Sequence, residues 1–167
     1  MERKREKYGN LFFDGAPSNG VIGGTARHYL NDSFFYNNTI INMTGHNSGF
    51  GVGKGSGNRI YNNLWYNSNN VSLDGAHDYN AADVDLGEAH DQLITDSSIF
   101  VNYNNDNFHL SGVTNVGDSS IGTEYSFDMD GSTRGGDGTW DRGAYEYGGG
   151  GGQCSNECST GQRECTD

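Results

Sequence analysis

The seven residues Tyr-Asn-Asn-Thr-Ile-Ile-Asn at 36–42 return 25 positions later as Tyr-Asn-Asn-Leu-Trp-Tyr-Asn at 61–67. Self-similarity at a period in the twenties is typical of solenoids, in which each repeat forms one coil stacked on the previous one. Apolar residues alternate within each copy, and Gly and Asn stand at the breaks, which indicates short β-strands joined by tight turns. The repeat therefore predicts an all-β fold of a few stacked coils.

The alternation also predicts which side chains lie inside the coils. If equivalent positions stack, Phe35 lies over Ile60 and Ile40 lies over Trp65 in the core. Asn38 and Asn63 fall where the chain bends between two short strands. An asparagine there tolerates a left-handed backbone, and its amide can bond to the equivalent amide one coil away. We therefore expect Asn38 and Asn63 to form an asparagine ladder.

Composition favours an ordered, turn-rich chain that does not bind nucleic acid. It contains 27 Gly and 20 Asn, yet aromatic residues make up 12%, which is more than a disordered chain would carry. The net charge is −12, and residues 8–153 hold 17 acidic against five basic side chains. Such a field repels phosphates. No apolar run is long enough for a membrane span, and we expect a monomer.

Five segments can be separated along the chain. We expect a charged N-terminal tail at 1–7, β-helix coils at 8–75, a closing region at 76–147 and a glycine linker at 148–153. The start of a truncated cysteine-rich segment follows at 154–167. Its three cysteines, Cys154, Cys158 and Cys165, indicate disulfides and an extracellular or cell-surface location, although a zinc site is an alternative.

Several motifs resemble the right-handed parallel β-helix family, the architecture of pectate-lyase-like surface proteins. The coil motifs are the two Asn-Asn copies, and the resemblance continues into the later part of the chain. The matching later stretches include His-Asp-Tyr-Asn at 77–80, Asp-Met-Asp-Gly-Ser-Thr-Arg at 128–134 and Trp-Asp-Arg-Gly-Ala-Tyr-Glu-Tyr at 140–147. One departure is Ser97, which stands where the family usually has proline. The resemblance implies a fold and an extracellular setting, and it implies no activity.

One candidate metal site follows from the residue pattern. Asp128, Asp130 and Gly131 are spaced like the start of a calcium loop, in which alternate carboxylates converge on one cation. The glutamate that such a loop needs downstream is missing. An acidic turn stabilised by the aspartate side chains is therefore the alternative. Calcium is the one cofactor that the sequence suggests.

One candidate ligand surface lies on the outer face of the coils. Arg59 and Tyr61 share that face, Tyr36 is expected one coil away, and Tyr66 points outward from the next strand. Aromatic rings stack on sugar rings, so these four residues could bind a polysaccharide or a cell-surface glycan. An ordinary tyrosine-rich β surface is the alternative. No catalytic residue is assigned.

Two functions remain open from the sequence. The first is a structural or carbohydrate-binding segment of an extracellular β-helix protein that is not catalytic by itself. The second is the C-terminal fragment of a polysaccharide lyase or glycoside hydrolase whose catalytic coils lie upstream. The absence of an acid–base pair at a definite spacing favours the first.

Overall fold

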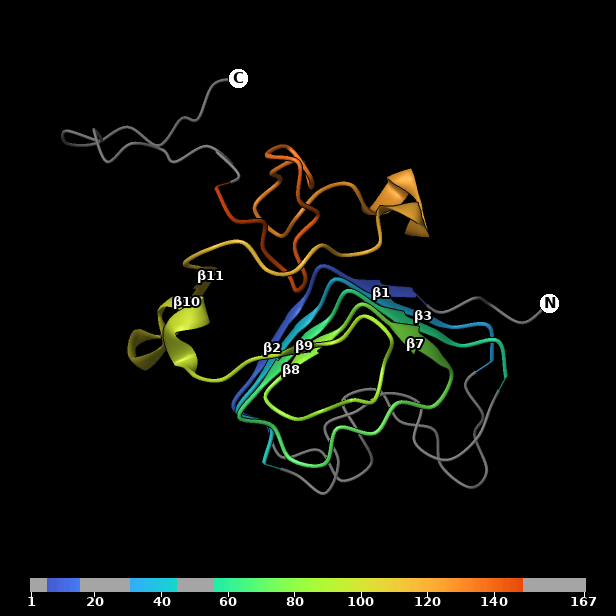
Figure 1. Ribbon diagram of the computed structural model, residues 1–167, viewed down its shortest axis with the longest axis horizontal. Coiled ribbons are helices and arrows are strands. Elements are labelled where there is room, and N and C mark those ends of the chain that lie inside the picture. The colour runs from blue at the N-terminus through green and yellow to red at the C-terminus, as the bar shows by residue number, and fades with distance from the viewer. Residues whose placement is uncertain (1–5, 16–30, 45–55, 149–167) are drawn as a thin grey trace.

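The computed structural model describes residues 6–15, 31–44 and 56–148. Nine short strands in this part of the chain form two sheets (Figure 1). Within each sheet the strands are parallel and are stacked one behind another. Sheet A has the order β1-β3-β5-β7, with bounds Glu6–Tyr8, Phe34–Tyr36, Arg59–Tyr61 and Ala76–Asp78. Sheet B has the order β2-β4-β6-β8-β9, with bounds Leu11–Phe13, Thr39–Ile41, Leu64–Tyr66, Ala81–Ala82 and Gln92–Leu93. The described chain is therefore all-β and consistent with a β-helix-like solenoid.

One strand of sheet A, a two-residue corner and one strand of sheet B together make what we call a tier. Parallel pairing places Phe35 beside Ile60 and Ile40 beside Trp65, as the sequence predicts. All four side chains are fully buried, and they form the centre of the interior core with Met43 and Ala82. Each buried pair contributes about 3–6 kcal/mol of transfer free energy. The predicted stacking of these two columns is confirmed.

The corners carry a row of buried amides. Asn38 Nδ2 donates to Asn63 Oδ1 at 2.9 Å, and Asn63 Nδ2 donates to Asn80 Oδ1 at 3.0 Å. Asn10 Nδ2 joins the other end by donating to Asn38 Oδ1. The row ends where Asn80 Nδ2 donates to the buried carboxylate of Glu88 at 2.7 Å.

The left-handed residue of each corner is not the one that the sequence predicts. Positive φ values occur one position earlier, at Asn37 (55°) and Asn62 (59°), and also at the equivalent Gly9 and Tyr79. The prediction that Asn38 and Asn63 are left-handed was therefore wrong. Either asparagine of an Asn-Asn pair can adopt the left-handed conformation. Here the first one does, and the second keeps a negative φ while its amide points along the stack.

The stack extends beyond the predicted boundary at residue 75. Strand β7 pairs with β5, β8 pairs with β6, and β9 pairs with β8, so the sheets continue to Leu93. The fourth tier follows the third after only 17 residues, measured from Asn63 to Asn80, instead of the 25 that separate Asn38 from Asn63. A search at one fixed period does not detect this shorter tier.

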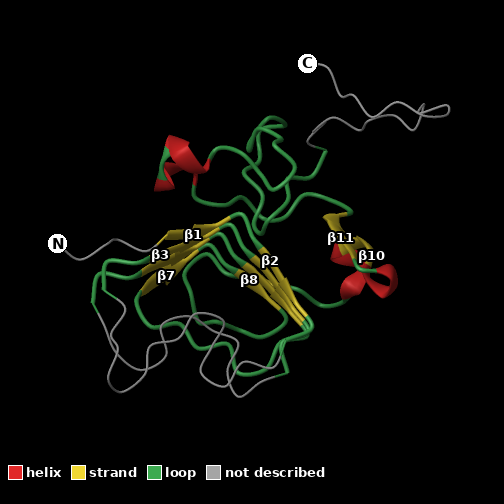
Figure 2. Cartoon of the chain, turned by 180° about the vertical axis from the view of Figure 1, so that it is seen from behind, coloured by secondary structure: helices red, strands yellow, loops and turns green. Residues whose placement is uncertain are grey.

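Beyond Leu93 the chain turns back along the outside of the stack. A two-stranded antiparallel hairpin, β10 (Phe100–Asn102) and β11 (Asn107–Leu110), lies next to sheet B (Figure 2). The only helices in the described ranges are single 3₁₀ turns, η1 (Ser97–Ile99), η2 (Tyr103–Asn105), η3 (Ser119–Ile121) and η4 (Thr123–Tyr125). Phe100, Phe108 and Leu110 cover Ile41 and Leu64 on the outer face of sheet B.

Residues 112–147 are the part of the expected closing region that lies outside the sheets and the hairpin, and from here on the name refers to them alone. They pack against the corners rather than across an end of the stack (Figure 1). Trp140 Nε1 donates to Asn37 Oδ1 at 3.3 Å, and Gly143 N donates to the carbonyl of Asn62 at 2.7 Å. Arg142 donates to the carbonyl of Asn80 at 2.8 Å. The closing region thus joins the second, third and fourth tiers from the side.

Candidate carbohydrate-binding surface

The outer face of sheet A presents an arginine between aromatic rings. The parallel register places Arg59 beside Phe34, and both belong to outward-facing positions of their strands. The guanidinium carbon of Arg59 lies 5.2 Å from the centre of the Tyr61 ring and 5.9 Å from that of Phe34. Arg59 is exposed, whereas Tyr61 and Phe34 are half-buried. This cluster of Phe34, Arg59 and Tyr61 is the candidate surface.

Tyr36 does not belong to this surface. Its side chain is 1% exposed, because Tyr125 lies edge-on against it at 5.0 Å and Trp140 joins the same cluster. Burial also raises the pKa of Tyr36. The prediction that Tyr36 contacts a sugar was therefore wrong. Tyr125 and Trp140, which cover Tyr36, lie about 90 to 100 positions later in the chain, so no local sequence pattern predicts this burial.

Tyr66 lies on the other sheet, apart from the cluster. It belongs to β6 of sheet B, where its ring packs edge-on against Phe100 at 5.6 Å and Tyr103 at 5.3 Å. The side chain is half-buried under the hairpin. Of the four residues proposed from the sequence, only Arg59 and Tyr61 therefore lie together on an accessible surface, and Tyr36 is buried beside them with its ring 6.1 Å from that of Tyr61.

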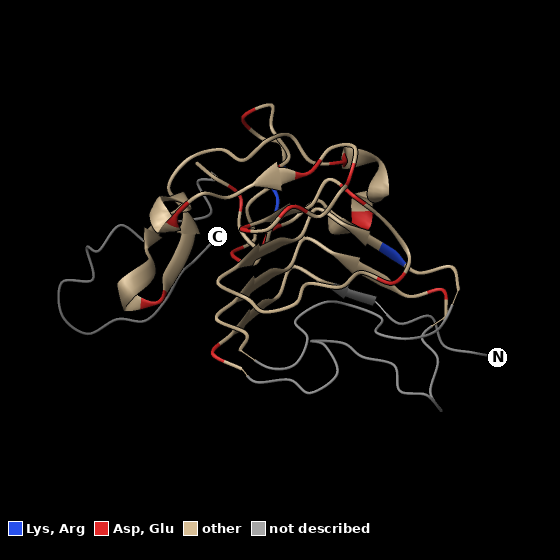
Figure 3. Cartoon of the chain, turned by 60° about the horizontal axis from the view of Figure 1, so that its bottom comes forward, with Lys and Arg blue, Asp and Glu red and all other residues tan. Residues whose placement is uncertain are grey.

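Arg59 differs from the other arginines whose side chains are described. Arg134 and Arg142 are 4% and 2% exposed, and their guanidinium groups donate to main-chain carbonyls of the closing region and of Asn80. Arg59 is exposed, and within the described ranges no carboxylate lies within 4.0 Å of it. Acidic residues outnumber basic ones along the described chain (Figure 3). Arg59 is thus an exposed cation that has no carboxylate partner among the described residues.

The closing region is organised around Arg134. Its guanidinium donates to the carbonyls of Asp141, Gly143 and Ala144 and lies 3.5 Å from the Glu146 carboxylate. Burial raises the pKa of Glu146 to about 7, although the N–H groups of Gly135 and Asp141 donate to it and oppose the shift. These buried groups bond to one another and to the main chain. They stabilise the closing region.

The Asp128 carboxylate is occupied by the backbone of its own turn. Its Oδ1 accepts from the N–H groups of Asp130 and Ser132, and its Oδ2 accepts from the N–H group of Glu146. Asp130 points instead to His109, with Oδ2 at 2.8 Å from Nε2. This arrangement is that of the acidic turn. No group of three or more metal-binding side chains occurs among the described residues, and calcium binding stays a hypothesis.

Sequence reasoning missed three histidine–carboxylate contacts. Besides His109 and Asp130, His77 Nδ1 lies 2.8 Å from Glu88, and His90 Nδ1 lies 2.8 Å from Asp78. The partners are separated by 11, 12 and 21 positions, so no helical or strand spacing could have paired them. The ring of His90 also stacks on Tyr79 at 4.4 Å. Within the described chain these histidines stabilise the fourth tier and the hairpin.

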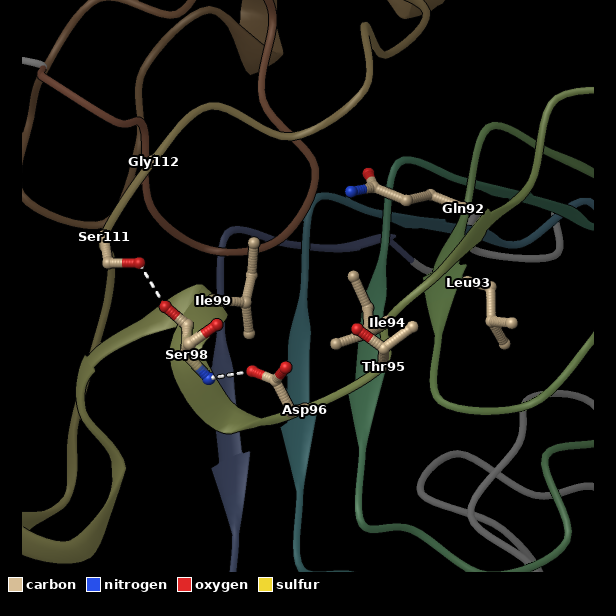
Figure 4. Close-up of a pocket in the computed structure, with 9 residues that line it drawn as sticks. All are labelled: Gln92, Leu93, Ile94, Thr95, Asp96, Ser98, Ile99, Ser111 and Gly112. Atoms are coloured by element: carbon tan, nitrogen blue, oxygen red, sulfur yellow. Dashed lines mark hydrogen bonds between the residues drawn. The ribbon is translucent and has the colours of Figure 1, made fainter.

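A shallow groove of about 260 Å³ lies beside β9 (Figure 4). Its lining comes from residues 92–96, the η1 turn and Ser111 with Gly112. Asp96 Oδ1 accepts from the N–H group of Ser98 at 2.7 Å, and Ser111 Oγ donates to the Ser98 carbonyl. No aromatic residue lines the groove, so a sugar ring could not stack there as it could at the Arg59 cluster.

The comparisons with known proteins give no similarity from which a function could be inferred. No family model matches the chain, and neither a curated protein nor a solved structure gives a match. None of the described helices is long and apolar enough to cross a membrane. Residues 1–5 of the charged tail, linker residues 149–153 and the three cysteines lie outside the described residues.

Proposed function

We propose that this chain is a non-catalytic, carbohydrate-binding module built as a right-handed parallel β-helix and located outside the cell. The observation that carries the binding function is the exposed Arg59, held above Tyr61 and beside Phe34 on the outer face of sheet A. A sugar ring can pack against the accessible part of the Tyr61 ring beside the guanidinium, while its hydroxyl or carboxylate oxygens accept from Arg59.

The geometry supports binding rather than hydrolysis or elimination. The surface is a sheet face with one cation and no carboxylate within 4.0 Å of it in the described ranges. General acid–base chemistry needs a proton donor and acceptor placed on either side of the reacting bond. One histidine–carboxylate contact, between Asp78 and His90, lies next to the surface, because Asp78 pairs with Tyr61 in the register of β5 and β7. A single such contact on one side does not supply the two flanking groups that hydrolysis requires.

The extracellular location is part of the same proposal. It is supported by the cysteines at 154, 158 and 165 and by the surface-protein character of the motifs that the chain resembles. The separation of these cysteines from the body by a glycine run fits a module tethered to another segment.

A glycan array tests the proposed function. The chain 1–167, labelled at one site, should bind a defined subset of glycans, and Tyr61→Ala should weaken that binding about 2–10-fold, as expected for loss of one stacking ring. Tyr147→Ala is the matched control, because Tyr147 is 38% exposed but lies in the closing region. Absence of any specific binding, or equal loss in both variants, would contradict the proposal.

A further inference from the structure

The candidate surface continues onto β7, the strand next to β5 in sheet A (Figure 1). In the parallel register of these two strands, Tyr61 pairs with Asp78 and Arg59 pairs with Ala76. Side chains at paired positions leave the same face of a sheet, from strands about 4.8 Å apart. Asp78 therefore lies next to Tyr61 on the outer face, and the exposed Ala76 places only a methyl group beside Arg59.

The Asp78 carboxylate is held in a fixed position by its neighbours. Its Oδ1 accepts from the main-chain N–H groups of Tyr79 and His90, both at 2.9 Å. Its Oδ2 lies 2.8 Å from Nδ1 of the His90 ring. Burial opposes ionisation, but these hydrogen bonds from His90 and Tyr79 lower the pKa of Asp78 overall. The side chain stays 21% exposed, so an oriented carboxylate is accessible beside the Tyr61 ring.

His90 is the residue that positions Asp78. Its ring is stacked on that of Tyr79, with the ring centres 4.4 Å apart and the planes 7° from parallel. An ionised carboxylate can only accept hydrogen bonds, so the Nδ1 atom that faces it carries the proton. The stacking and the hydrogen bond together fix the orientation of the imidazole, and through it that of the carboxylate.

Asp78 does not neutralise Arg59, although both lie next to Tyr61. Within the described ranges no carboxylate lies within 4.0 Å of the Arg59 side chain, and the ion-pair partner of Asp78 there is His90. The surface thus presents a hydrogen-bond donor at Arg59 and a separate acceptor at Asp78, with the half-buried Tyr61 ring next to both.

The part of the chain that contains Asp78 is acidic throughout. Residues 74–96 include no Lys or Arg. They include seven carboxylates, at Asp74, Asp78, Asp83, Asp85, Glu88, Asp91 and Asp96. Arg59 is therefore a single exposed cation next to a segment that repels anions.

We propose that this surface binds neutral sugars in preference to acidic ones, and that Asp78 sets the preference. The inference rests on the carbohydrate-binding function proposed above. A sugar hydroxyl both donates and accepts, so a neutral sugar can accept from Arg59 and donate to Asp78 while it packs against Tyr61. A sugar carboxylate only accepts, so it is attracted by Arg59 and repelled by Asp78.

The size of the preference follows from the charges. A unit charge about 6 Å from a ligand charge changes the affinity about threefold at the dielectric constant of water. On an acidic sugar, Arg59 and Asp78 act in opposite directions and offset one another. The other carboxylates of residues 74–96 then leave a net repulsion, which a neutral sugar does not experience.

A matched pair of ligands tests the proposal. The tightest ligand on the glycan array should be neutral, and its acidic counterpart is made by oxidising a primary hydroxyl to a carboxyl group. Isothermal titration calorimetry is run at pH 8, where histidine ordinarily carries no charge. In 50 mM salt the wild type should bind the neutral member at least about threefold more tightly, and 500 mM salt should reduce that ratio.

Two substitutions should move the ratio in opposite directions. Asp78→Asn keeps an acceptor oxygen and the shape of the side chain but removes the charge, so the ratio should fall about threefold. Ala76→Asp adds a carboxylate next to Arg59 at an exposed position, so the ratio should rise. Asp106→Asn is the matched control, because Asp106 is exposed in the hairpin turn at a φ of 55° that asparagine tolerates. It should leave the ratio unchanged.

The outcomes separate this inference from the proposed function. Circular dichroism should show all the variants folded. An acidic glycan as the tightest ligand would overturn the inference, and so would a ratio that stays the same in Asp78→Asn and Ala76→Asp. If Tyr61→Ala still weakens binding in that case, the carbohydrate-binding function stands without the preference. Absence of any glycan binding by the wild type would contradict both.

Discussion

Replacing Asn63 by alanine removes the middle of the buried row of amides. The Asn63 side chain is fully buried and takes part in five hydrogen bonds. Its Nδ2 donates to the carbonyls of Phe35 and Tyr61 and to Asn80 Oδ1 at 2.9–3.0 Å. Its Oδ1 accepts from both the main-chain N–H and the Nδ2 of Asn38. The substitution therefore breaks the row between the second and fourth tiers.

The expected cost follows from these contacts. Each buried polar group that loses its partner costs about 1–3 kcal/mol, and the small cavity adds roughly 1 kcal/mol. We expect Asn63→Ala to lower the free energy of unfolding by about 3–5 kcal/mol. Asn67→Ala is the control, because Asn67 is exposed and its amide belongs to the outer row with Asn42. Its φ of 48° makes alanine slightly strained, so we expect a loss of about 1 kcal/mol.

Urea denaturation followed by circular dichroism and by tryptophan fluorescence measures both values. Trp65 reports on the interior and Trp140 on the closing region, so coincident transitions also show that the two unfold together. A difference of at least about 2 kcal/mol between the variants is expected. Equal midpoints for Asn63→Ala and Asn67→Ala would refute the reasoning that the buried row stabilises the stack.

Three further predictions concern pH, calcium and catalysis. Burial raises the pKa of Glu146 from 4.5 to about 7, so its contribution to stability is present below pH 4.5 and is lost as the pH rises through 7. The urea midpoint should therefore fall between pH 4.5, 6 and 7.5, and Glu146→Gln should reduce that fall. An unchanged pH dependence of the midpoint in Glu146→Gln would show that Glu146 does not cause it. Since Asp128 already accepts three main-chain N–H groups, chelation should leave the melting temperature unchanged, whereas a fall that disappears in Asp128→Asn/Asp130→Asn would establish a calcium site. The chain should release no unsaturated, ultraviolet-absorbing products from polyuronates, and their appearance would favour the lyase hypothesis.

The sequence predicts the stacked columns because the signal is local and repeated. Ile60 and Phe35 occupy the same place in two nearly identical segments, and parallel stacking of identical segments brings identical positions together. The fourth tier was missed for the opposite reason. It has His77 where the others have Phe35 and Ile60, and Ala82 where they have Ile40 and Trp65, so its apolar pattern is weak.

The candidate surface was only partly predictable. Arg59 and Tyr61 alternate with the buried Ile60, and that period fixes them on the outer face. The burial of Tyr36 depends on Tyr125 and Trp140, which belong to an irregular segment without periodicity. The role of Glu88 at the end of the amide row is similar, because its bonds to Asn80 span a loop whose path no local residue pattern determines.

The most direct test of the proposed function is the affinity of one array-selected oligosaccharide, measured by isothermal titration calorimetry. The double variant Arg59→Ala/Tyr61→Ala should bind it at least tenfold more weakly than the wild type, and Tyr147→Ala should bind it equally well. Circular dichroism should show all three proteins folded. Equal affinity of the double variant and the wild type would contradict the assignment of the binding surface to the outer face of sheet A.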